Sequence, residues 1–120
     1  MTPTCQSDVG KIKTLLLKRA EDAFVDQSFI DKQWQSLGFT SKPDFNTAVA
    51  EYQGFVEIIN KFGIKIVFAP FDKSTGLDSI YVRDSSIVCS KGIILCNMGK
   101  KARAFEPAAC LPTFKLLELP

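Results

Sequence analysis

Apolar residues recur along the chain with two different spacings, which together predict a mixed α/β fold. Between residues 45 and 62 they return every three or four positions, as on one face of a helix of about five turns. We expect Ser41 to cap this helix, Pro43 to lie in its first turn and Gly63 to end it. The apolar face, which we expect to be core rather than ligand-binding, consists of Phe45, Ala48, Val49, Tyr52, Phe55, Val56, Ile59 and Phe62.

Short apolar runs on either side of this helix predict strands. Residues 11–18 favour a first strand, although their three leucines are also compatible with a helix, and residues 64–69 favour a buried strand. Ser79 to Asp84 is expected to be the next strand. A hairpin follows, with residues 87–89 pairing with 93–97 around a Lys91–Gly92 turn, so that Cys89 lies opposite Ile94.

Other segments give weaker signals. Residues 21–39 mix acidic and aromatic side chains, and we expect irregular or partly helical structure there. Beyond Gly99 the periodicity fades, and Pro107 and Pro112 are expected to limit any helix. The apolar segment from Phe114 to Pro120 favours either a strand tucked against the fold or a chain that belongs to a longer protein.

Composition narrows the class of protein. A chain of 120 residues is one domain or a piece of a larger one, and 46% hydrophobic residues are enough for a packed core. A net charge of +2 argues against nucleic acid as the main partner, and no apolar run approaches the ~20 residues of a membrane span. The polar N-terminus lacks the apolar core of a signal peptide, so we expect a cytoplasmic protein.

The cysteines give no sign of a metal site. Cys5, Cys89, Cys96 and Cys110 form no C-x-x-C pair, and the chain contains no histidine. We therefore expect reduced cysteines, no metal and no cofactor. A nucleophilic thiol needs a nearby base or cation, so we expect no catalytic cysteine in this chain.

Asp78, Asp84 and Arg103 are the candidate binding residues. Two carboxylates and an arginine have the charges needed to hold both ends of an arginine-like ligand. However, a strand from Asp78 to Asp84 would separate the two carboxylates by about 20 Å. Asp78 must then lie on a loop that curls back, or these residues only form surface ion pairs.

Several spaced motifs together resemble one known family. Residues 41–70 begin SKPDF and end IVFAP, residues 77–84 read LDSIYVRD, and residues 98–107 read MGKKARAFEP. In this order, with the hairpin between them, they resemble the N-terminal part of the pentein superfamily, in its amidinotransferase and dimethylarginine dimethylaminohydrolase branch. The resemblance implies an α/β fold that is part of a pentein-type α/β propeller, with residues 1–120 supplying about the first two of five ββαβ-like modules.

The resemblance also implies roles for the candidate residues. Asp84 matches the aspartate that receives the substrate guanidinium, Asp78 matches one that binds near the substrate α-amino group, and Arg103 matches an arginine that grips the substrate carboxylate. Arg83 stands where some dimethylarginine hydrolases have an acidic residue, which leaves the substrate open. The catalytic cysteine, histidine and carboxylate of the family fall beyond Pro120, so this chain alone is expected to be inactive.

The function implied by the resemblance is guanidine modification. The whole enzyme would hydrolyse arginine or methylated arginine to citrulline, and amidino transfer to an amine is the alternative. A non-catalytic short paralogue that binds arginine-like ligands or a partner chain is a third possibility. The expected partners are an arginine-like small molecule and the remaining C-terminal modules or a second copy, with no nucleic acid and no membrane.

Overall fold

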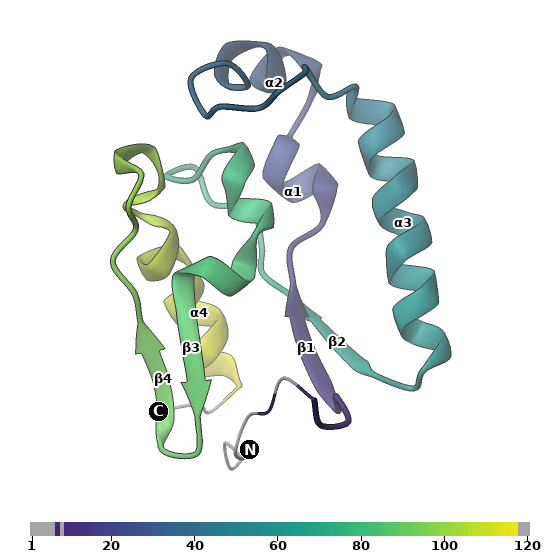
Figure 1. Cartoon of the computed structure of the whole chain (residues 1–120), viewed down its shortest axis with the longest axis vertical. Helices are drawn as coiled ribbons and strands as arrows, with labels where there is room; N and C mark the ends of the chain where they lie inside the picture. The colour runs from purple at the N-terminus through teal and green to yellow at the C-terminus, as the bar shows by residue number, and fades with distance from the viewer. Residues whose placement is uncertain (1–6, 8, 118–120) are drawn as a thin grey trace.

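A parallel pair of strands and a β-hairpin form two separate two-stranded sheets (Figure 1). The computed structural model describes residue 7 and residues 9–117. The first sheet pairs β1 (Thr14–Leu17) with β2 (Lys65–Phe68), and Leu15 lies beside Ile66. The connection between them contains α1 (Ala20–Phe24), α2 (Gln27–Gln33) and α3 (Phe45–Lys61), as a parallel pair requires a crossover. The strands predicted on either side of the long helix are confirmed, but β2 is partly buried rather than buried.

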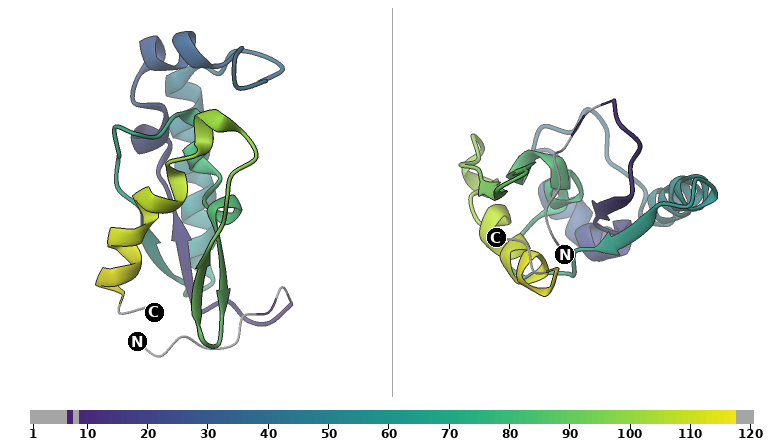
Figure 2. Two further views of the ribbon diagram at one scale, coloured as in Figure 1. Left: turned by 90° about the vertical axis from the view of Figure 1, so that its left-hand side faces the viewer. Right: turned by 90° about the horizontal axis from the view of Figure 1, so that it is seen from below.

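The second half of the described chain folds around the hairpin. It begins with two 3₁₀ turns, η1 (Leu77–Ile80) and η2 (Val82–Ser85), which lead into β3 (Ser86–Cys89) and β4 (Gly92–Leu95). A third turn, η3 (Lys101–Arg103), precedes α4 (Glu106–Leu116). Figure 2 shows the hairpin and α4 on one side of the molecule and α3 on the opposite side.

The N-cap of the long helix lies three residues after the expected one. Asp44 is the N-cap, and its carboxylate accepts hydrogen bonds from the Thr47 backbone N–H at 2.8 Å and the Thr47 hydroxyl at 2.7 Å. Asp44 satisfies a free N–H group of the first turn, so Ser41 is not the cap and Pro43 precedes the helix. Gly63 follows the last turn with a φ of +69°, which confirms it as the stop.

The apolar face of α3 is only partly covered. Val56 is buried, but Phe55 and Phe62 are exposed, together with Ile58 on the adjacent face. The helix was predicted correctly, whereas the core position of Phe55 and Phe62 was wrong. Tyr52 is half-buried and meets the Phe55 ring edge-on, with 5.7 Å between ring centroids.

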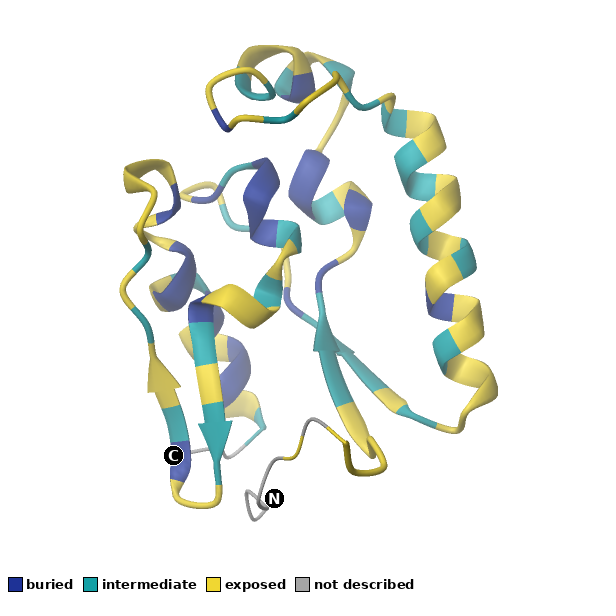
Figure 3. Cartoon of the chain, in the orientation of Figure 1, coloured by how far each residue is buried: buried dark blue, intermediate teal, exposed yellow. Residues whose placement is uncertain are grey.

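The hydrophobic core cluster lies between α1, α2 and η1, and α4 carries further buried residues (Figure 3). Segment 21–39 is therefore largely helical, and its regularity comes from burial rather than from a clear sequence period. Gln33 links α2 to η1, because its side-chain oxygen accepts from the Leu77 backbone N–H at 3.1 Å. The core consists of Ala23, Phe24, Ile30, Leu37 and Leu77.

The strand predicted from Ser79 to Asp84 is wrong. These residues form η1 and η2, although Tyr81 and Val82 have high strand propensity. The carbonyls of Asp78 and Tyr81 accept hydrogen bonds from the Arg103 side chain instead of from a neighbouring strand. The same two carbonyls also accept from the backbone N–H groups of Tyr81 and Asp84, which close the two turns, so the buried guanidinium reinforces this conformation.

Two further expectations near the C-terminal end are also corrected. In the hairpin, Cys89 pairs with Gly92 and Ile87 with Ile94, because the two-residue loop is formed by residues 90 and 91, one position earlier than predicted. The α4 helix continues through Pro112, whose missing N–H is outweighed by burial of Thr113 and Phe114. The tucked strand expected from Phe114 is thus helical up to residue 116, and residues 118–120 lie outside the described part.

The mixed α/β class is confirmed, but two small sheets do not themselves make a propeller. Among the described residues, no helix combines the length and the hydrophobicity needed to cross a membrane.

Val25, between α1 and α2, adopts a strained backbone conformation. Its φ is +65° and its ψ is −66°, and the Asp26 N–H donates to the Phe24 carbonyl at 2.7 Å, which closes a γ-turn. A β-branched residue at positive φ is a genuine outlier. The turn is held because Phe24 is buried and Asp26 caps α2 by accepting from Phe29.

Replacing Val25 with glycine is expected to stabilise the protein. Relief of the strain is worth about 1–3 kcal/mol, and the added backbone entropy of glycine costs about 0.5–1 kcal/mol. Urea denaturation should therefore show a free energy of unfolding raised by about 1 kcal/mol. Val25→Ala is the control, because alanine keeps the penalty at positive φ. Equal stability of the two variants would contradict the assignment of strain.

Candidate functional site

Asp78 and Asp84 converge on the guanidinium of Arg103. The two successive 3₁₀ turns fold the intervening segment back on itself, so the 20 Å separation of an extended strand does not arise. Arg103 Nη1 lies 2.8 Å from Asp84 Oδ2, and Arg103 Nε lies 4.0 Å from Asp78 Oδ2. The structure therefore brings together all three residues singled out from the sequence.

Arg103 is buried and uses nearly all of its hydrogen-bond donors. Its Nε and Nη2 form a fork onto Glu106, with distances of 2.9 Å to Oε2 and 2.8 Å to Oε1. Nη2 also donates to the Asp78 carbonyl at 3.1 Å and the Tyr81 carbonyl at 3.4 Å. Hydrogen bonds to Glu106, and then to Asp84, raise the pKa of Arg103, which keeps the guanidinium fully charged.

Sequence reasoning missed Glu106, although a signal was present. Glu106 is the first residue of α4, three positions after Arg103, and both side chains are buried. A carboxylate in the first turn of a helix is favoured by the helix dipole. The spacing of Arg103 and Glu106 by three positions could therefore have indicated this ion pair in the sequence.

The two aspartates differ in their access to solvent. The Asp84 side chain is 51% exposed, and of its two oxygens only Oδ2 is bound to a described residue. The Asp78 side chain is only 4% exposed, and its Oδ2 accepts from Lys100 Nζ at 2.9 Å. Asp84 can thus accept a further donor from outside, whereas Asp78 is already paired with a lysine that sequence reasoning did not select.

An open pocket of ≈ 490 Å³ lies beside Asp78. Its walls include Tyr81, Lys100 and the loop of residues 37–43 that follows α2. Pockets of this size accommodate small molecules. Asp78 is the only one of the three predicted site residues that lines this pocket, while Asp84 and Arg103 form an ion pair outside its lining.

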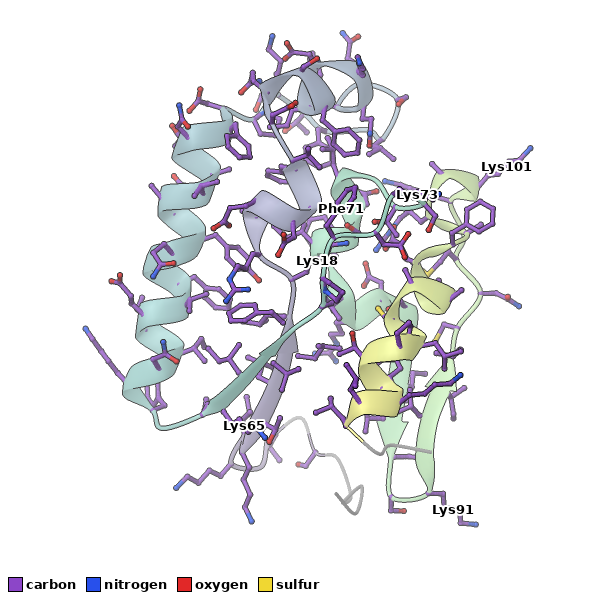
Figure 4. All side chains as sticks on the ribbon, turned by 180° about the vertical axis from the view of Figure 1, so that it is seen from behind. Lys18, Lys65, Phe71, Lys73, Lys91 and Lys101 are labelled. Carbon is purple, nitrogen blue, oxygen red and sulfur yellow. The ribbon has the colours of Figure 1, made fainter. Side chains whose placement is uncertain are left out.

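A second polar cluster lies in the interior between β1 and α4. Lys18 is buried and donates to the Thr75 hydroxyl at 3.2 Å, and burial lowers the pKa of its ammonium group. Figure 4 shows Lys18 in the middle of the molecule, whereas Lys91 and Lys101 extend at its margins. No carboxylate of the described residues forms an ion pair with Lys18. The neighbouring Ser79 hydroxyl is buried without a hydrogen-bond partner.

Cys110 lies in the same cluster and is not an activated thiol. Its sulfur is 3.7 Å from the Ser85 hydroxyl, and burial raises its pKa. Cys89, Cys96 and Cys110 are free cysteines, whereas Cys5 lies outside the described residues. Within the described part of the chain, no group of three or more potential metal ligands forms a site.

The fold is similar to that of solved dimethylarginine dimethylaminohydrolase structures. One is a histidine-to-glycine variant of this enzyme as an adduct with S-methyl-L-thiocitrulline, at a TM-score of 0.68 and 21% identity. Another is the adduct with 4-chloro-2-hydroxymethylpyridine, at a TM-score of 0.67 and 19% identity. Each match covers 89% of this chain but only 39% and 38% of the other chain.

The sequence itself matches no known family and no curated protein. The structural likeness, at these identities, therefore establishes a shared fold over about two fifths of the length of the solved enzymes.

Loss of Arg103 is expected to damage stability far more than loss of the Asp84 charge. Arg103→Ala leaves the buried Glu106 carboxylate without its cation, whereas Asp78 keeps Lys100, and breaking the buried pair with Glu106 costs about 3–5 kcal/mol. Asp84→Asn removes only one half-exposed ion pair, worth about 0.2–1 kcal/mol. Chemical denaturation of both variants measures the difference in the free energy of unfolding. Equal losses would show that the pair with Asp84, rather than the pair with Glu106, accounts for most of the stability that Arg103 provides.

Replacement of Lys18 by methionine is expected to stabilise the protein at neutral pH. Burial of an ammonium group without a carboxylate partner is costly, because the hydrogen bond to Thr75 replaces only part of its hydration, and methionine has a similar shape without the charge. Because the pKa of Lys18 is lowered in the folded state, the unfolded chain binds more protons between that pKa and the ordinary value of 10.5. The free energy of unfolding of the unmodified protein should therefore rise with pH across this window.

The pH dependence provides the control for this prediction. Lys18→Met should remove the rise in stability between the lowered pKa and 10.5, whereas Lys91→Met, at the exposed hairpin loop, should leave it unchanged. Denaturation curves collected from pH 7 upward test both variants. A Lys18→Met protein that keeps the full rise would show that another group is responsible.

Proposed function

We propose that this chain is the N-terminal part of a pentein-type enzyme that modifies the guanidinium group of arginine or methylated arginine. The observation that carries the proposal is the carboxylate cluster, since Asp84 and Glu106 already hold a guanidinium through short charged hydrogen bonds. The shared fold with dimethylarginine dimethylaminohydrolase supports the same chemistry.

In this proposal each site residue has a distinct role. Asp84 receives the substrate guanidinium through the oxygen that faces away from Arg103, and Arg103 fixes the orientation of Asp84. Asp78 binds the substrate α-ammonium from the wall of the pocket. Arg103 Nη1 donates to no described residue other than Asp84, and through its second hydrogen Arg103 contacts the substrate carboxylate.

In this proposal the nucleophile comes from residues outside these 120. The chain contains no histidine, and the pKa of Cys110 is raised rather than lowered. In the proposed whole enzyme, a cysteine thiolate attacks the guanidinium carbon and forms a thiouronium intermediate as the protonated amine leaves. Water then attacks this carbon, releasing citrulline and regenerating the thiolate.

The remaining propeller modules would also cover the sheet edges and the apolar residues that are exposed here.

Two alternatives remain under the same fold. An amidinotransferase would pass the amidino group to an amine, and its product would depend on an added amine acceptor, unlike that of a hydrolase. A non-catalytic protein that binds arginine-like ligands or a partner chain is favoured by the absence of histidine from the sequence. The length of the natural reading frame distinguishes this binding protein from an enzyme with further modules.

The chain alone is expected to release neither citrulline nor urea from arginine or methylated arginine, because it contains no histidine and the pKa of the Cys110 thiol is raised. Colorimetric product assays with the purified 120-residue protein test this expectation. Turnover that is abolished by substitution of Cys96 or Cys110 would contradict it.

In a full-length protein that contains this segment, Asp84→Asn should impair turnover of both arginine and a simple alkylguanidine. The amide places a donor opposite the donors of the substrate, and the loss of transition-state stabilisation should be about 3–5 kcal/mol. Asp31→Asn, an exposed carboxylate on α2, is the control. Near-normal kcat/KM for Asp84→Asn on both substrates would refute its role as the guanidinium receptor.

A further inference from the structure

Lys100 places its ammonium group between two acceptors from distant parts of the chain. Its Nζ donates to the Leu37 carbonyl at 2.7 Å and to Asp78 Oδ2 at 2.9 Å. Leu37 begins the pocket loop after α2, and Asp78 lies on η1. An ammonium group with a carbonyl and a carboxylate in hydrogen-bond range is thus already bound at the edge of the pocket.

The two partners of this ion pair are unequal. The Asp78 side chain is 4% exposed and fixed within the Arg103 network, whereas the Lys100 side chain is 54% exposed. A lysine is a flexible, strongly hydrated point charge, so it can leave this position and regain its hydration. The buried carboxylate cannot leave, and without Lys100 its nearest described cation is Arg103 Nε, 4.0 Å away. The position therefore requires a cation, but the cation need not be Lys100.

A ligand cation can reach the same position from the pocket. Asp78, Lys100 and Tyr81 all line the pocket, and the Tyr81 ring is exposed beside them. An aromatic face next to a carboxylate favours the approach of an organic cation. A cation in the pocket can thus approach the position beside Asp78 that the Lys100 ammonium group now occupies.

We infer that the Lys100 ammonium group competes with the ammonium group of the ligand for Asp78, an inference that rests on the proposed role of Asp78 as the receptor of the ligand ammonium. A ligand with a primary ammonium group binds Asp78 only when Lys100 moves out into solvent. Movement of Lys100 also releases the Leu37 carbonyl, so occupation of the site by ligand and attachment of the pocket loop are coupled through one lysine side chain.

The test compares the affinity of lysine variants for n-butylammonium, a probe that carries an ammonium group but no guanidinium. An internal group that occupies the position about nine-tenths of the time weakens the apparent affinity about tenfold. Lys100→Met, which has no donor, should therefore bind n-butylammonium about tenfold more tightly than the unmodified chain in an NMR titration. Lys100→Gln serves as a second variant in case Lys100→Met does not fold.

Three controls separate competition from a general change in charge. Lys101→Met removes the neighbouring exposed lysine and should leave the affinity unchanged. Lys100→Arg keeps a competing cation and should resemble the unmodified chain. Adding Asp78→Asn to Lys100→Met should abolish the gain, because the carboxylate that attracts the probe is then absent.

The outcomes also distinguish this inference from the proposed function. Equal n-butylammonium affinity of Lys100→Met, Lys100→Gln and Lys101→Met would overturn internal competition, even if a full-length protein hydrolysed arginine. Conversely, a gain in affinity for Lys100→Met that requires Asp78 would support internal competition, even if a full-length protein acted on no guanidine compound.

Discussion

The buried guanidinium of Arg103 is the interaction on which the second half of the fold depends. A charged group without water needs acceptors around it, and these come from both 3₁₀ turns and the start of α4. Two of the acceptors are backbone carbonyls, of Asp78 and Tyr81, which an extended strand would direct to a neighbouring strand. The network thus reinforces turns that backbone hydrogen bonds close, and the turns place Asp78 at the pocket while Asp84 remains half-exposed.

The elements that the sequence predicted correctly are those set by local patterns. The α3 helix has a clear period, and its end at Gly63 needs only a residue that tolerates positive φ. The errors occur where distant polar groups decide the structure. Tyr81 and Val82 have strand propensity, but the hydrogen bonds between this segment and the Arg103 side chain outweigh it. Pro112 lies within α4 because burial of its neighbours outweighs one missing hydrogen bond.

Candidate site residues were predictable only where residue type alone indicates a charged ligand. Asp78, Asp84 and Arg103 were selected in this way, and the structure brings them together. Lys100 was not selected, since its partners are a backbone carbonyl and an aspartate 22 residues away. A backbone acceptor such as that of Leu37 leaves no trace in the sequence, so only the fold could reveal this position.

The charge balance of the cluster connects the internal cations with the proposed ligand. Three carboxylates, those of Asp78, Asp84 and Glu106, face two cations, Lys100 and Arg103, which leaves one negative charge. When Lys100 moves into solvent, two negative charges remain uncompensated. A ligand with one ammonium and one guanidinium group supplies two positive charges, one for Asp78 and one for Asp84, and its carboxylate is the proposed partner of Arg103. An arginine-like zwitterion with an extra guanidinium therefore fits this cluster better than a simple monovalent cation does.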